Sequence, residues 1–107
     1  MKFTCVCQGG NVRSVGLAYA LKYGHKQDAL AVSWQANDKK TQAMLYKWAD
    51  YIVVMQAIFI QYIPKRYLAK VRVVDVGEDR YGSAFHPELQ NYLKAVTEDW
   101  SKRGFKI

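Results

Sequence analysis

The sequence contains very little cysteine, proline and histidine, with two residues of each among its 107. Cys5 and Cys7 are separated by one residue, so they cannot cross-link distant parts of a fold. We expect both to be free thiols in a reducing compartment. His25 and His86 lie far apart in the sequence and lack the spacing of metal ligands. We therefore expect no metal and no cofactor.

Long hydrophobic runs are also missing. No apolar run approaches the roughly 20 residues that a membrane-spanning helix needs. The longest candidate, Ala57–Ile63, is interrupted by Gln61 and stopped by Pro64. The first residues, Met1-Lys2-Phe3, lack the apolar core and the cleavage site of a signal peptide. We therefore expect a cytoplasmic protein that has no membrane partner.

The composition is that of a folded chain, because half of the residues are hydrophobic and 23% are charged. The length suits one core, and we expect residues 1–107 to form a single domain. The net charge is +7, but lysine and arginine are spread along the chain without a block of five or six. This charge attracts anions such as phosphorylated proteins, nucleotides or nucleic acid, and it is equally typical of a solvated basic surface.

Short apolar runs alternate with helical periodicity along the chain. Strands are expected at Phe3–Val6, Ala29–Trp34, Tyr51–Met55 and Val71–Val74. Helices are expected from Ser14 to a stop at Gly24, after an N-cap at Asn37-Asp38, over Ala57–Leu68 with a split or kink at Pro64, and from Pro87 to Gly104. The alternation predicts a three-layer α/β/α fold around a four-stranded parallel sheet.

Helical stripes predict which side chains face the core. In the second predicted helix these are Met44, Leu45, Trp48 and Ala49. In the last helix they are Leu89, Tyr92 or Leu93, Val96 and Trp100.

One stretch between the first strand and the first helix carries the chemistry of a phosphate site. It reads Cys7-Gln8-Gly9-Gly10-Asn11-Val12-Arg13-Ser14. A loop with glycines that runs into a helix N-terminus directs N–H groups and a positive dipole end at one point. Arg13 adds a planar set of donors that matches phosphate oxygens, and the same positive field favours the thiolate of Cys7. The stretch therefore predicts a phosphate-binding loop in which Cys7 is the nucleophile and Ser14 steadies the sulfur.

Cleavage of a phosphate ester also requires a proton for the leaving group, which a carboxylic acid on a neighbouring loop can supply. The loop Asp75–Phe85 follows the fourth predicted strand, so it shares the carboxyl edge of the sheet with the Cys7 loop. Asp79 is the first candidate, and Glu78 and Asp75 are the alternatives.

These residues resemble the low-molecular-weight protein tyrosine phosphatase superfamily, and most of all its short bacterial and phage branch. The resemblance rests on Cys7–Ser14 and on the segments Ala31–Ser33, Lys47–Met55, Val74–Asp79 and His86–Leu89. It implies a flavodoxin-like low-molecular-weight phosphatase fold with Cys7 as nucleophile, Arg13 as phosphate ligand and Ser14 as support for the thiolate. It also implies a general acid on the loop after the fourth strand.

The chain departs from the family pattern at three places, and one of them is His86, where the short branch usually has an aspartate before Pro-Glu-Leu. The family loop usually has asparagine three residues after the cysteine, where this chain has Gly10, and its asparagine is Asn11. The family's acid loop commonly reads Asp-Pro, whereas Glu78-Asp79 is followed by Arg80.

Three functions therefore remain open at this point. The first is a metal-independent cysteine phosphatase that hydrolyses phosphotyrosine or a similar phosphomonoester through a phosphocysteine. The second is a non-catalytic module that binds phosphate, a nucleotide or a partner through the same loop. The third is binding of nucleic acid through the basic surface, which we do not favour. The physiological substrate and the oligomeric state do not follow from the sequence.

Overall fold

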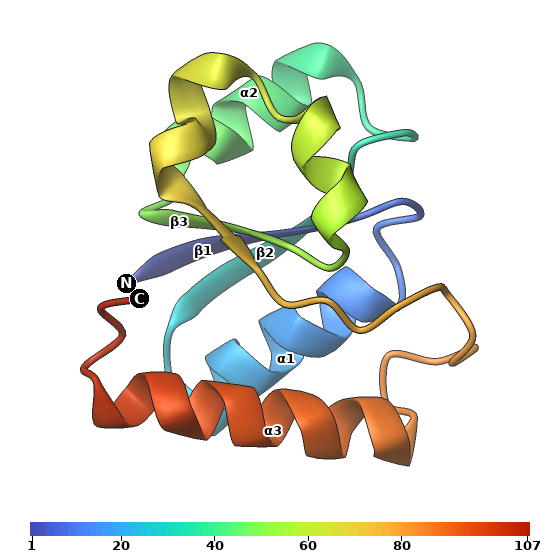
Figure 1. Cartoon of the computed structure of the whole chain (residues 1–107), viewed down its shortest axis with the longest axis vertical. Helices are drawn as coiled ribbons and strands as arrows, with labels where there is room; N and C mark the ends of the chain where they lie inside the picture. Colours follow the sequence, from blue (N-terminus) through green and yellow to red (C-terminus); the bar gives the residue numbers. More distant parts are fainter.

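The computed structural model describes residues 1–107 as alternating strands and helices (Figure 1). Its two short 3₁₀ helices are labelled η. The elements are β1 (Lys2–Cys7), α1 (Arg13–His25), β2 (Asp28–Ser33), α2 (Lys39–Trp48), β3 (Tyr51–Val54), η1 (Ala57–Tyr62), η2 (Lys65–Lys70), β4 (Val71–Val73) and α3 (Pro87–Lys102). None of these helices is long and apolar enough to cross a membrane.

The four strands form one parallel sheet in the order β2-β1-β3-β4. Val6 of β1 pairs with Val32 of β2 on one side and with Val54 of β3 on the other. Helices α1 and α3 cover one face of the sheet, and α2 with the two 3₁₀ helices covers the other (Figure 1). The predicted three-layer fold with a four-stranded parallel sheet is confirmed.

The central strands are apolar because both of their faces are covered. Every residue of β1 from Phe3 to Cys7 is buried, and so are Ile52–Val54 of β3. The ring of Phe3 stacks on Trp100 of α3, with the ring centroids 6.0 Å apart. This packing anchors the amino end of β1, and the Cys7 loop leaves from the opposite end of the strand.

The sequence predicts that the first helix stops at Gly24, but the helix does not end there. It continues to His25, and the chain turns at Lys26, whose φ of 55° is left-handed. The next N–H, from Gln27, donates to the carbonyl of Leu21 at 3.0 Å. The left-handed residue therefore comes two positions after the glycine, because the turn must deliver the chain to β2 at Asp28.

The core side of α2 agrees with the prediction in part, because Ala49 is buried and Leu45 and Trp48 pack against the core, but Met44 does not. Met44 is 63% exposed, whereas Gln42 and Tyr46 are buried. The amide of Gln42 donates to the carbonyls of Trp34 at 3.1 Å and Asn37 at 2.7 Å. These bonds turn a polar face of α2 inward, which an apolar stripe cannot reveal.

Other predicted details are confirmed. Asp38 caps α2 by accepting the N–H of Thr41 at 2.7 Å, and Pro64 separates η1 from η2. In α3 the buried member of the Tyr92 or Leu93 alternative is Leu93.

Candidate active site

The loop after β1 holds the thiol of Cys7 on the inside of the molecule, where the residue is only 2% exposed. The thiol donates to Oγ of Ser14 at 3.0 Å and accepts the N–H of Gly10 at 3.2 Å. The same two partners would stabilise a thiolate, since a hydroxyl can donate to it as well as accept from the thiol. The sequence prediction that Ser14 supports the sulfur agrees with this geometry.

Gly10 is required by the shape of this loop. Its φ is +69°, and a Cβ atom on it would lie 2.8 Å from the backbone nitrogen of Ser33 and 2.9 Å from its Cβ. Ser33 ends β2, and its hydroxyl donates to the carbonyl of Gln8. The loop is therefore braced from the neighbouring strand. Sequence reasoning missed this role of Ser33, although a hydroxyl at the carboxyl end of a neighbouring strand is a signal for it.

The start of α1 leaves N–H groups free for an anion. Its N-cap residue, Val12, has no side chain that could cap the helix, and the first turn contains no acidic residue. The unpaired N–H groups and the positive end of the helix dipole therefore face the loop without a built-in counter-charge. Asn11 is exposed, and Gln8 lines the pocket described below.

Arg13 is the largest fully buried side chain, with 1% exposure. Its Nη1 donates to Oε1 of Gln56 at 2.5 Å and to the carbonyl of Gly77 at 2.8 Å. The guanidinium carbon Cζ lies 5.3 Å from the ring centre of Phe59, and Nε has no hydrogen-bond partner. Every acceptor it has is neutral, and this buried cation retains an unused donor at Nε. That state is costly in a structural residue and suits a ligand for an anion.

A pocket of about 520 Å³ opens above this guanidinium. One wall is aromatic: Trp34 and Tyr62 stack with ring centroids 3.7 Å apart and planes 5° apart. The full lining is Gln8, Arg13, Trp34, Gln56, Ile58, Phe59, Tyr62, Glu78 and Asp79. The pocket thus combines the guanidinium of Arg13 with aromatic side chains and two carboxylates, and Cys7 is not among its lining residues.

The structure separates the three candidate acids. Glu78 and Asp79 line the pocket with Arg13, whereas Asp75 lines a different one. The carboxylate of Asp75 accepts the N–H of Ala57 at 3.0 Å and of Gly77 at 2.9 Å. These two backbone bonds, together with the charge of Arg13, hold the pKa of Asp75 below its ordinary value. Asp75 is therefore suited to remain ionised, and it does not face the substrate space as an acid must.

No group of three or more histidine, cysteine, aspartate or glutamate residues has the arrangement of a metal site. The second thiol, Cys5, is fully buried in β1, and burial raises its pKa. It is therefore suited to stay protonated inside the core.

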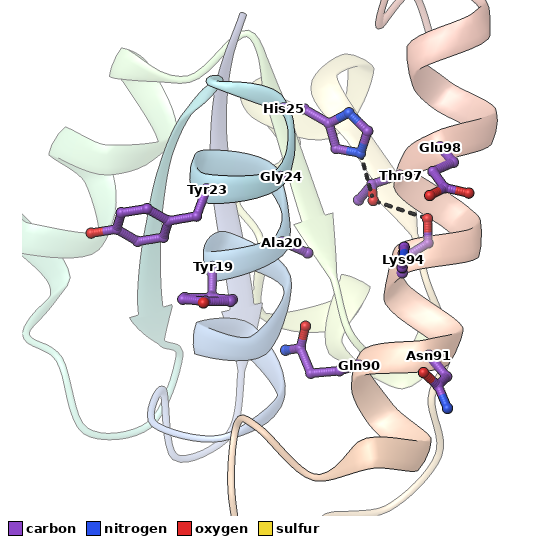
Figure 2. Close-up of a pocket in the computed structure, with 10 residues that line it drawn as sticks. All are labelled: Tyr19, Ala20, Tyr23, Gly24, His25, Gln90, Asn91, Lys94, Thr97 and Glu98. Carbon is purple, nitrogen blue, oxygen red and sulfur yellow. Dashed lines mark hydrogen bonds between the residues drawn. The ribbon is translucent and has the colours of Figure 1, made fainter.

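A second pocket, of about 350 Å³, lies between α1 and α3 (Figure 2). In it Nε2 of His25 lies 3.2 Å from Oγ1 of Thr97, whose hydroxyl donates to the carbonyl of Leu93 at 2.9 Å. Figure 2 shows the side chain of Gln90 extending from α3 toward α1, whereas those of Asn91 and Glu98 point away from α1. None of the residues predicted for phosphate chemistry lines this pocket.

Comparison with solved structures identifies proteins that share this fold. No protein-family model matches the sequence, and neither does any curated protein. Among solved structures, Wzb of Vibrio vulnificus in complex with benzylphosphonate superposes with a TM-score of 0.75 and 17% identity, over 95% of this chain and 97% of that one. The YwlE arginine phosphatase of Geobacillus stearothermophilus gives 0.68 and 14%, over 98% and 96%.

The tyrosine phosphatase Wzb of Escherichia coli K30, in complex with phosphate, gives a TM-score of 0.70 and 13% identity, over 95% of this chain and 96% of that one. The chain therefore has the flavodoxin-like fold of the low-molecular-weight phosphatases, as its sequence predicted.

Proposed function

We propose that this chain is a metal-independent, cysteine-dependent phosphatase that hydrolyses an aryl phosphomonoester such as phosphotyrosine. The observation that carries the proposal is the pairing of a buried thiol with a buried, incompletely bonded guanidinium on one loop. Cys7 and Arg13 are 2% and 1% exposed, and Nε of Arg13 has no partner. A structural core would not retain both groups in this state without an anion to bind.

In the first step the thiolate of Cys7 attacks phosphorus and the bond from phosphorus to the leaving oxygen breaks. Arg13 and the loop N–H groups stabilise the charge on the three phosphoryl oxygens. Asp79, or Glu78 in its place, gives its proton to the leaving oxygen. The products are the free alcohol or phenol and a phosphocysteine.

In the second step water attacks the phosphocysteine. The carboxylate formed in the first step takes a proton from this water, the sulfur–phosphorus bond breaks, and inorganic phosphate leaves. The departing thiolate of Cys7 then accepts hydrogen bonds from Ser14 and from the N–H of Gly10, which lie 3.0 and 3.2 Å away. The side chains then have the protonation states with which they began.

The aromatic wall supports an aryl substrate. Trp34 and Tyr62 present flat surfaces beside Arg13, and a phenyl ring packs well against such surfaces. The similar proteins include a tyrosine phosphatase and an arginine phosphatase. A planar guanidine could also pack there, so both substrate types belong in the first assay.

The test is hydrolysis of an aryl phosphate by the purified protein in the presence of a chelator. We expect turnover that vanadate blocks and that Cys7→Ser reduces on the order of 10³-fold or more. Phosphate should still bind to Cys7→Ser, because its ligands are intact. Full activity of Cys7→Ser would overturn the proposal. Phosphate binding by the wild type without turnover of any phosphoester would favour the non-catalytic binding module instead.

A further inference from the structure

The net charge of +7 is concentrated in one third of the chain. Residues 39–74 contain seven basic residues and a single acidic one, Asp50. In residues 75–107, by contrast, acidic residues slightly outnumber basic ones. The basic residues of the 39–74 segment are Lys39, Lys40, Lys47, Lys65, Arg66, Lys70 and Arg72.

This segment forms most of the layer on one face of the sheet, opposite α1 and α3 (Figure 1). Two of its basic residues have internal partners: Lys70 donates to the end of α2, and Arg72 donates to the carbonyl of Ile107. The other five are exposed. The two salt bridges of the structure, Arg80 with Glu88 and Arg103 with Asp99, lie outside the segment. None of the basic residues of this face therefore forms a salt bridge.

The basic face begins at the rim of the candidate active site. Ile58 and Tyr62 of η1 line the pocket, and Lys65 and Arg66 follow Tyr62 by three and four residues. Their Cα atoms therefore lie at most about 11 and 14 Å from that of Tyr62, given a reach of about 3.6 Å per residue. An extended peptide whose phosphorylated residue occupies the pocket would bring residues three or four positions away to the same place.

The pocket lining also contains negative charge, from Glu78 and Asp79, which lie on the loop after β4 and not on η1. A nucleic acid has a phosphate at every nucleotide on both sides of the pocket, so one side would meet these carboxylates. The pocket lining also exposes an aliphatic side chain, that of Ile58, which is 62% exposed and suits a peptide side chain better than a stacked base. Basic residues that follow η1 and carboxylates on the loop after β4 therefore favour a polypeptide that is acidic on one flank only.

We propose that the segment Ile58–Arg66 is a docking surface for acidic residues on one flank of the phosphorylated residue in a protein substrate. This proposal rests on the proposed phosphatase function. Lys65 and Arg66 attract the acidic flank, while Ile58 packs against its apolar side chains. Glu78 and Asp79 disfavour the reverse orientation of the peptide by repulsion.

The test uses two sets of three phosphotyrosine peptides. One set varies the residues before the phosphotyrosine and the other varies those after it. Within a set the peptides differ only in having acidic, neutral or basic residues on that flank. At low ionic strength we expect kcat/KM for the best acidic peptide to exceed that for the neutral one by about 10-fold, with the difference shrinking as salt is added. The double variant Lys65→Glu/Arg66→Glu should remove the preference. The matched control Lys94→Glu/Lys102→Glu, which makes the same change in net charge on α3, on the opposite face of the molecule, should retain it. Neither variant should change turnover of a small aryl phosphate.

Equal kcat/KM for the three peptides of each set, beside normal turnover of the small aryl phosphate, would overturn the docking proposal alone. Absence of all turnover by the wild type would instead overturn the proposed function. In that case docking is measured by the fluorescence anisotropy of the same peptides as they bind to Cys7→Ser. Loss of the preference for the acidic peptide when Lys65→Glu/Arg66→Glu is added supports the docking proposal. Persistence of that preference contradicts the docking proposal. Tighter binding of single-stranded DNA or RNA through Lys65 and Arg66 would also contradict it.

Discussion

The carboxylate of Asp75 and the guanidinium of Arg13 are joined through one residue, Gly77. Oδ1 of Asp75 accepts the Gly77 N–H at 2.9 Å, and the Gly77 carbonyl accepts from Nη1 of Arg13 at 2.8 Å. Oδ2 of Asp75 accepts the N–H of Ala57, which follows Gln56, the second acceptor of Arg13. Asp75 thus fixes both groups that orient the arginine, which makes it a positioning residue.

Replacement of Asp75 should therefore weaken phosphate binding more than it slows the chemical step. In Asp75→Ala we expect KM for an aryl phosphate and the inhibition constant of phosphate to rise about 10-fold, because Arg13 loses its fixed orientation. Asp75→Asn should recover part of the loss, since its oxygen can still accept one N–H. A drop in kcat with unchanged KM and phosphate affinity would contradict this role and restore Asp75 as a candidate acid.

The same bonds predict how stability depends on pH. Because the folded pKa of Asp75 lies below its ordinary value of 3.8, its stabilising effect is complete above that pH. The effect is lost as the pH falls through the lowered folded pKa. The free energy of unfolding should therefore differ between wild type and Asp75→Asn at pH 6, and the difference should shrink below about pH 4. Denaturant unfolding at several pH values measures it, and a difference that grows in acid would contradict the assignment.

Asp79→Asn should slow turnover of substrates with poor leaving groups by about 10²-fold or more, because the leaving oxygen then receives no proton. An activated aryl phosphate, whose leaving group needs less help, should suffer less. Glu78→Gln is the matched comparison, since both residues line the pocket. If Glu78→Gln has the larger effect and abolishes the basic limb of the pH profile, the acid is Glu78.

Gly10→Ala should impair the loop even though it adds only one methyl group. The added Cβ would meet the backbone nitrogen of Ser33 at 2.8 Å, at a φ of +69°. The N–H of Gly10 would then move away from Sγ of Cys7. Gly24→Ala is the control, because it lies in α1 with no atom within 4 Å of the new Cβ.

For Gly10→Ala we expect lost phosphate binding and a lower melting temperature. For Gly24→Ala we expect unchanged activity and about 1 kcal/mol of added stability. Calorimetry and phosphate titration measure both. Normal phosphate affinity in Gly10→Ala would show that the loop does not depend on this backbone geometry.

Much of the fold followed from the sequence because its signals are local. The apolar run Tyr51–Met55 can only be a strand covered on both faces, and Pro64 cannot continue a helix. The inward position of Gln42 in α2 did not follow, because this residue is buried by hydrogen bonds to the loop after β2, which are tertiary contacts.

The candidate site divides in the same way. Cys7, Arg13 and Ser14 lie within one stretch of eight residues, so they could be recognised as a motif. The residues that hold Arg13 come from distant segments, Gln56 after β3 and Gly77 after β4. Asp75 was a plausible acid by its position, and only the direction of its hydrogen bonds gives it another role.

The central claim is that the thiol of Cys7 becomes covalently phosphorylated. The most direct measurement is a rapid acid quench of the protein during turnover of an aryl phosphate, followed by mass spectrometry of the peptide that contains Cys7. We predict a phosphoryl group on the sulfur of Cys7 in the wild type, formed at least as fast as steady-state turnover, and its absence when vanadate is present. Turnover without any phosphorylated Cys7, or with phosphate on another residue, would contradict the account.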